Sequence, residues 1–374
     1  MIPRLVPSRF TALVLVAALV AGRYAWGKLR DFESRRRLIG FVKRALQWEF
    51  WPAWAAYLPL LPYLLYLAAK HRSLTLFTAA NPGMYSGGLV GESKSESLRH
   101  LSTVPGAVAE FTLIPAGTAA QAEEFPVVLK PDKGERGTGV AIVRSSEDLN
   151  EYLRGATGDT ILQRYIPGRE YGVYYVRYPD EAQGRVLYVT EKRFPMVTGD
   201  GRSELKDLIF RDPRAVCMAS AYLRVAKRPV DSIPAAGEQV SLVEIGSHCR
   251  GAVFLDGSHL ITPELDRAID RVSQTHPGFY LGRYDVRTPS AEALQRGEFH
   301  VIELNGVSSE ATHVYDPAVT IREAYRVMGR HWRTAFEIGA VNRARGVSPM
   351  SARELLGLLF PPRAPRAARA VYLA

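Results

Sequence analysis

The residues of this chain best suited to chemistry are two carboxylates and an amide, Asp285, Glu303 and Asn305. Glu303 and Asn305 alternate with apolar residues in a run typical of a strand, so we expect both side chains on one face. Such oxygen ligands suit Mg²⁺, which usually shares them with substrate phosphates. We predict that these three residues hold a pair of Mg²⁺ ions, with Mn²⁺ as an alternative, and that Arg283 shares the face of Asp285.

Cationic and glycine-rich segments precede these residues. Lys130 ends an apolar run and precedes Pro131, so a strand would hold its ammonium group rigidly as a point charge for a phosphate. Gly134, Gly137 and Gly139 follow within six residues, and their loop has no Walker GK[ST] ending. Backbone amides of such a mobile hairpin can close over phosphate oxygens. The alternatives are a solvated lysine at a strand end and an ordinary hairpin.

Residues 163–170 (QRYIPGRE) form the next candidate segment. A strand leaving one lobe offers backbone N–H and C=O groups to the edge of an adenine ring. Glu170, seven residues after Gln163, offers a carboxylate that can accept hydrogen bonds from both ribose hydroxyls. The segment therefore suits a nucleoside.

The order of these motifs over roughly residues 91–345 resembles that of the ATP-grasp superfamily, specifically its carboxylate–amine ligases. The resemblance implies that Lys94, Lys130 and Lys192 contact phosphate. It implies that Gln163 and Ile166 contact adenine and that Glu170 contacts ribose. Arg283 would stabilise the charge that develops in the reaction. The segment after Lys192 resembles a loop of cyanophycin synthetases and of bifunctional glutathione synthetases. The alternatives are a surface helix lysine at Lys94 and a plain β-turn after Lys192.

The resemblance implies an enzyme that uses ATP and Mg²⁺ to convert a carboxylate into an acyl phosphate, which an amine then attacks to form an amide. The expected substrates are therefore a small carboxylate and a small amine. A phosphotransferase and a non-catalytic, membrane-tethered nucleotide-binding protein are the alternatives. D-alanine–D-alanine ligases have an N-terminal α/β domain that contributes to substrate binding, and this chain shows only one plausible strand there. The substrates cannot be assigned from any subfamily.

The pattern of the chain predicts an α+β protein with two lobes that clamp the nucleotide, as in the ATP-grasp fold. The expected strands cover residues 74–79, 108–114, 127–129, 139–144, 160–165, 171–177, 187–192, 242–245 and 301–304. The expected helices cover residues 93–101, 146–154, 263–275 and 319–338. Ser93 and Glu96 have the spacing of a capping box at the first helix.

Charge is concentrated at the two ends of this 374-residue chain. Residues 1–46 carry ten Lys/Arg against two acidic residues, and residues 343–374 carry six against one, whereas the net charge is +10. The middle is thus slightly acidic, which argues against a nucleic-acid partner. Basic ends beside apolar segments suit an anionic membrane surface, and solubilising tails are the alternative. Cys217 and Cys249 match no metal spacing and read as reduced thiols.

Two apolar segments lie near the N-terminus. Residues 10–22 are short for a membrane span, and residues 50–69 contain three prolines with several Trp and Tyr, a composition typical of the headgroup boundary. Residues 23–44 between them hold eight Lys/Arg and should stay cytoplasmic, so at most one segment can span if the enzyme is to reach ATP. We predict a short anchor at 10–22 and an interfacial segment at 50–69; the alternative for the latter is a helical hairpin packed on the domain.

These patterns divide the chain into four predicted segments. They are a basic extension with a short anchor (1–46), a Pro/aromatic-rich membrane-interface segment (47–73), the ATP-grasp catalytic domain (74–345) and a basic Pro/Ala/Arg tail (346–374). The expected location is the cytoplasmic face of a membrane.

Overall fold

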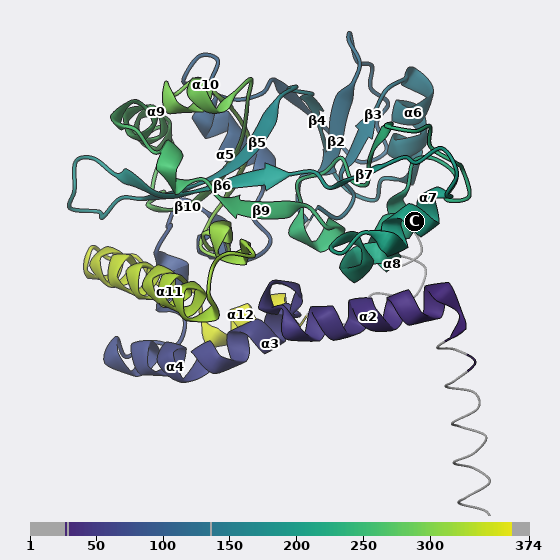
Figure 1. Ribbon diagram of the computed structural model, residues 1–374. Coiled ribbons are helices and arrows are strands. Elements are labelled where there is room, and N and C mark those ends of the chain that lie inside the picture. Colours follow the sequence, from purple (N-terminus) through teal and green to yellow (C-terminus); the bar gives the residue numbers. More distant parts are fainter. Residues whose placement is uncertain (1–26, 28–29, 135–136, 361–374) are drawn as a thin grey trace, which may run out of the picture. The chain divides into compact units, whose positions relative to one another are not determined.

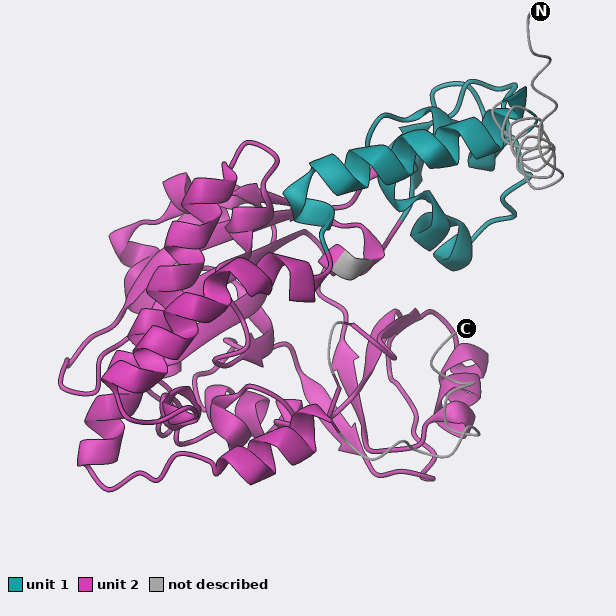
Figure 2. Ribbon diagram, turned by 90° about the horizontal axis from the view of Figure 1, so that it is seen from below, with its two compact units in different colours: residues 1–51, 196–242 teal, residues 52–195, 243–374 magenta. Residues whose placement is uncertain are grey.

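The structure, a computed structural model, describes residues 27, 30–134 and 137–360. The chain forms two compact units, one of residues 1–51 with 196–242 and the other of residues 52–195 with 243–374 (Figure 2). Residues 196–242, predicted as part of the catalytic segment, thus cluster with the N-terminal part. The boundaries of the four predicted segments remain predictions.

The first unit is built on helix α2 (Phe32–Leu46), which packs on α7 (Leu205–Arg211) and α8 (Ala215–Val225). Asp31 caps α2 by accepting a hydrogen bond from the backbone N–H of Ser34 at 2.7 Å. Arg214 donates two hydrogen bonds to the carboxylate of Glu49, a buried residue of the 3₁₀ helix Trp48–Phe50. Strands β7 (Met196–Thr198) and β8 (Gln239–Ser241) pair antiparallel.

The second unit contains two antiparallel sheets (Figure 1). The four-stranded sheet has the order β1 (Phe111–Ile114), β4 (Thr160–Arg164), β2 (Val127–Pro131), β3 (Ala141–Val143). Helix α6 (Ser146–Gly155) covers it through Leu149, which packs with Val127, Leu129 and Val143. The alternating apolar residues of β2 thus bury one face of this lobe.

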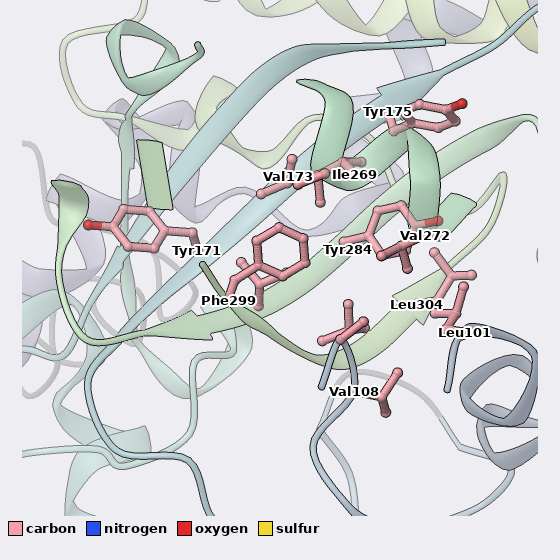
Figure 3. Close-up of a cluster of buried hydrophobic side chains, with 14 of the residues drawn as sticks. Leu101, Val108, Tyr171, Val173, Tyr175, Ile269, Val272, Tyr284, Phe299 and Leu304 are labelled. Atoms are coloured by element: carbon pink, nitrogen blue, oxygen red, sulfur yellow. The ribbon is translucent and has the colours of Figure 1, made fainter. Parts of the chain in front are cut away.

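The five-stranded sheet has the order β11 (His300–Asn305), β10 (Leu281–Thr288), β5 (Arg169–Val176), β6 (Arg185–Arg193), β9 (Val253–Asp256). One face forms the main core against α5 (Lys94–Leu101), α9 (Pro263–Ser273) and α10 (Ala291–Gln295). Figure 3 shows β5 contributing Tyr171, Val173 and Tyr175 to this core, together with Ile269 of α9. The residues between them on β5 therefore face the opposite side.

The apolar segment at residues 50–69 is folded into short helices. They are α3 (Ala53–Tyr57), a 3₁₀ turn (Leu58–Leu60) and α4 (Leu61–Lys70). Prolines start these pieces, as expected for a residue that fits the first helical turn but not the interior. Leu67 of α4 packs against Met328, Trp332 and Phe336 of the long helix α11 (Ile321–Ala344). One face of this segment therefore packs on the domain, as the alternative of a packed helical hairpin predicts.

Membrane insertion stays a prediction. Among the described residues, no helix combines the length and the apolar character that crossing a bilayer requires. The predicted anchor at residues 10–22 lies outside the described residues. Of the predicted basic tail, residues 352–359 form helix α12 (Ala352–Leu359), which has a capping box between Ser351 and Glu354; residues 361–374 are not described.

The prediction of an α+β protein is confirmed, and the helices expected at 93–101, 146–154, 263–275 and 319–338 are present. Two predicted strands are wrong. Residues 74–79 contain a 3₁₀ helix (Leu76–Ala79) packed on α11, and residues 242–245 are irregular, with β8 ending before them. Leu76, Leu242 and Val243 are buried although they lie outside the strands, so burial explains why the composition of both segments resembles that of a strand.

Candidate functional site

Several of the polar residues predicted to do chemistry lie on the face of the five-stranded sheet opposite the core. Pairing places Lys192 of β6 opposite Glu170 of β5, and Glu170 opposite Arg287 of β10. Two residues along β10, Asp285 lies opposite Glu303 of β11. Because alternate residues of a strand share a face, these neighbouring rows present their charges on the same side.

The predicted metal ligands are brought together by this register. Asp285 faces Glu303, and Asn305 faces Arg283 in the next row. The side-chain nitrogen of Asn305 is buried and has no hydrogen-bond partner among the described residues. In the described part of the chain, no group of three or more His, Cys, Asp and Glu side chains could hold a metal ion. The predicted set has two carboxylates and an amide, and this oxygen-rich chemistry fits Mg²⁺.

Cations neutralise the buried carboxylates. Lys192 Nζ lies 3.0 Å from Asp285 Oδ2 and 2.9 Å from Glu170 Oε1, and Arg283 Nε lies 3.0 Å from Asp285 Oδ1. Burial alone would raise the pKa of Asp285, but Arg283 and Lys192 outweigh it and lower that pKa. Burial alone would lower the pKa of Lys192, yet Asp285 and Glu170 raise it. Asp285 therefore stays ionised.

Lys130 links the two sheets. Its ammonium group donates to Gln163 Oε1 of β4 at 2.9 Å and to the backbone oxygen of Ile302 in β11 at 2.6 Å. The pairing of β10 with β11 skips Ile302, and this bulge releases its carbonyl from the ladder. The Gln163 side chain also donates to Ala109 O at 3.3 Å. Gln163 also pairs with Phe111 of β1 and Val128 of β2, so its backbone belongs to the sheet as well.

Lys94 is the first residue of α5, and its position depends on Asp132. The carboxylate of Asp132, just beyond β2, accepts from Ser95 N at 2.7 Å and from Ser93 Oγ at 2.8 Å. These bonds attach the start of α5 to the end of β2, where Lys130 lies. Lys94 Nζ is 3.8 Å from Glu303 Oε1 and donates to Gly134 O. It is 9% exposed, which excludes the alternative of a surface lysine.

A hydrogen bond from Arg250 fixes the glycine-rich loop at Gly137. Gly137 and Gly139 have φ of +73° and +74°, backbone angles that favour glycine. Arg250 donates to Gly137 O at 2.8 Å. Residues 135–136 of the loop are not described. Lys94 donates to Gly134 O, so this end of the loop lies next to a lysine predicted to contact phosphate.

A loop beyond β11 completes the site near Arg283. Arg283 Nη1 donates to the backbone oxygen of Glu310 at 3.2 Å. The carboxylate of Glu310 accepts hydrogen bonds from the phenol groups of Tyr57 and Tyr315. Tyr57 belongs to α3, so the apolar N-terminal segment contacts this end of the site through Glu310.

Sequence reasoning missed Asp132, Arg287 and Glu310. Each acts through partners that are distant in sequence, such as Glu170 for Arg287 and Ser95 for Asp132. Only the alternation of Arg283, Asp285 and Arg287 on one strand could have indicated that Arg287 shares the face of the other two.

Comparison with known proteins shows similarity to cyanophycin synthetases, whereas no family model matches the chain. The enzyme of Geminocystis herdmanii (strain PCC 6308) is 25% identical over 222 residues, covering 53% of this chain and 25% of that protein. The enzyme of Trichormus variabilis (strain ATCC 29413 / PCC 7937) is 26% identical over 210 residues, covering 51% and 23%. The chain thus spans about a quarter of the length of these curated relatives.

Solved structures show more distant similarity. A D-alanine–D-alanine ligase from Bacillus anthracis has a TM-score of 0.40 and 13% identity, covering 73% of this chain and 70% of that chain. A bifunctional glutathione synthetase from Pasteurella multocida has a TM-score of 0.36 and 18% identity, covering 64% and 35%. The similarity to cyanophycin synthetases confirms the predicted resemblance to ATP-grasp carboxylate–amine ligases as a similarity of this chain.

Proposed function

We propose that the protein is an ATP- and Mg²⁺-dependent ligase that joins a small carboxylate to a small amine. The observation that carries this proposal is the register of the five-stranded sheet, which places Asp285 opposite Glu303 with Lys192 and Arg283 beside them. Two acidic residues among clustered cations suit the triphosphate of a nucleotide and its metal ion.

In the proposed reaction, a carboxylate oxygen of the acid attacks the γ-phosphorus of ATP. The bond from that phosphorus to the β,γ-bridging oxygen breaks, and ADP leaves with the electron pair. The amine nitrogen then attacks the carbonyl carbon of the acyl phosphate, loses a proton and expels inorganic phosphate. Lys94, Lys130 and Lys192 would hold phosphate oxygens and Arg283 would stabilise the developing charge. Mg²⁺, held by Asp285, Glu303 and Asn305, would neutralise phosphate charge.

Release of ADP by the full chain, measured with pools of carboxylates and amines, tests the proposal. We expect turnover to need both an acid and an amine, and we expect hydroxylamine to trap a hydroxamate. ADP formation with a stable phosphorylated product and no hydroxamate would instead indicate a phosphotransferase. Nucleotide binding without turnover in any pool would favour the non-catalytic alternative.

Substitution of Glu303 by Gln tests the metal ligands. The amide keeps the shape of the side chain but removes the charge that a divalent ion needs, so we expect turnover to fall at least about a hundredfold. Glu151→Gln, at an exposed position of α6, is the matched control and should keep full activity. Equal activity of the two variants, both with the melting temperature of the unchanged protein, would refute the assignment.

We also propose that the protein binds the cytoplasmic face of a membrane. Trp54, Leu58, Leu61 and Leu65 are 46–72% exposed, and their spacing follows one side of the α3–α4 segment. Leu38, Phe41, Val42 and Leu46 are similarly exposed along α2 in the other unit. Helices with one apolar face bind at the boundary of headgroups and acyl chains.

A further inference from the structure

Arg287 occupies the end of the site where a nucleoside would lie. Its Nε and Nη2 donate to Glu170 Oε2 at 3.2 and 3.1 Å, and its Nη1 donates to the backbone oxygen of Ile166 at 2.9 Å. Glu170 is the residue predicted to bind ribose, and Ile166 is predicted to lie at the adenine edge. One guanidinium group therefore already holds two groups that the nucleoside would use.

The same guanidinium covers the aromatic surfaces nearby. It lies 5.0 Å from the ring centroid of Tyr165 and 5.8 Å from that of Phe194. The Arg287 side chain is 7% exposed and that of Glu170 is 6% exposed. A purine placed against these rings would have to replace the guanidinium group.

The remaining acceptor capacity of Glu170 is small. Lys192 donates to its other oxygen, Oε1, and a Cβ added to Gly246 would lie 2.2 Å from that oxygen, so the backbone at Gly246 covers it closely. A carboxylate has about four lone-pair sites. Three are already engaged, so Glu170 cannot accept hydrogen bonds from both ribose hydroxyls while Arg287 stays bound.

We propose, building on the proposed use of ATP, that Arg287 is an internal competitor for the nucleoside part of the nucleotide and so determines its affinity. In the free protein the guanidinium satisfies Glu170 and Ile166, and nucleotide binding displaces it. Since a nucleotide binds only the fraction of molecules in which Arg287 has moved, the apparent affinity is lower than the intrinsic affinity by that fraction.

Substitution of Arg287 by Met tests this proposal. Met replaces the aliphatic part of the arginine and packs well against aromatic rings, but it cannot donate to Glu170 or Ile166. Glu170 keeps Lys192 at 2.9 Å, so its charge is not left unpaired. We expect the dissociation constants of Mg-ATP and of adenosine, measured by calorimetry on the full chain, each to fall at least about tenfold. Arg267→Met, at an exposed position of α9, should leave both unchanged.

The outcomes separate this inference from the proposed function. If the unchanged protein binds Mg-ATP and the Met variant binds it equally or more weakly, the competitor role is refuted while nucleotide use stands. If neither protein binds Mg-ATP or adenosine, both proposals fail. If only the Met variant binds, the competitor role is supported. Should the Met variant not fold, Arg287→Gln decides, because its shorter, uncharged amide holds Glu170 less strongly than the guanidinium does. This variant should bind Mg-ATP more tightly than the unchanged protein does.

Discussion

Lys130 is the clearest case of a residue whose chemistry depends on burial. Its ammonium group has two hydrogen-bond acceptors, Gln163 and Ile302, and is 5% exposed. Burial is the main cause that lowers the pKa of Lys130 to about 8, because removing a charge from water is unfavourable; Glu303 opposes this and Lys94 adds to it. The lysine is therefore poised to gain or lose its proton near neutral pH.

The affinity for Mg-ATP should consequently depend on pH. Below a pH of about 8 Lys130 is charged and can attract phosphate, and above that value the free protein loses this charge. We expect the dissociation constant of Mg-ATP to rise between pH 8 and 9 by up to about tenfold per pH unit. Titration calorimetry from pH 7 to 9 measures it.

Lys130→Met is the control for this pH dependence. The variant should bind Mg-ATP weakly and almost equally across the range from pH 7 to 9, because the titrating group is gone. An equally steep pH dependence in the variant would assign the effect to another group.

Among the elements, α4 illustrates how an apolar segment can have two environments. Leu67 is 1% exposed against Met328 and Trp332 of α11, whereas Leu65, two residues earlier, is 53% exposed. A helix with a period of 3.6 residues turns these two side chains in different directions. The packed face ties α4 to α11, and α3 before it positions Tyr57 beside Glu310.

Leu67→Ala should therefore destabilise the protein by about 2–4 kcal/mol, through lost burial and the cavity left behind. Leu65→Ala, the same change on the exposed face, should alter the unfolding free energy by less than about 0.5 kcal/mol. Urea unfolding of both variants measures the difference. Similar values for the two variants would mean that α4 does not pack on α11 in solution.

For the whole molecule, the decisive features are the separation of charge and the exposed apolar faces. The basic residues gather at the chain ends, and the middle, which contains the candidate site, is slightly acidic. An anionic lipid surface attracts basic segments and accepts apolar side chains at the same boundary. These features together support the proposed membrane location.

Vesicle flotation of the full chain should reveal this binding. We expect the protein to float with vesicles of phosphatidylserine and phosphatidylcholine and to bind phosphatidylcholine alone more weakly. Combined Trp54→Ser, Leu58→Ser and Leu65→Ser substitutions should weaken binding at least about tenfold, because less apolar surface is buried. The control replaces Asn150, Glu151 and Arg154, exposed polar residues of α6, by Ser. If the unchanged protein, mixed with the vesicles in the absence of detergent, stays in solution and does not float with them, membrane binding is refuted.

The sequence alone determined the α+β class and the strand that carries Glu303, because alternation and turn residues act locally. Glu170 lies just before the strand expected at 171–177, and β10, which carries Asp285, is not among the expected strands. It also indicated that Glu303 and Asn305 share a face, a consequence of strand periodicity. The strands expected at 74–79 and 242–245 were wrong because a short apolar run is equally compatible with burial in irregular or 3₁₀ structure.

Only the tertiary structure decided which charges meet. Register places Lys192 and Arg287 on either side of Glu170, and a bulge at Ile302 offers a carbonyl to Lys130. It also brings Asp132 to the start of α5 and Tyr57 to Glu310. These partners are far apart in sequence, and their pairing depends on how strands align and helices pack, which no local pattern of residue types encodes.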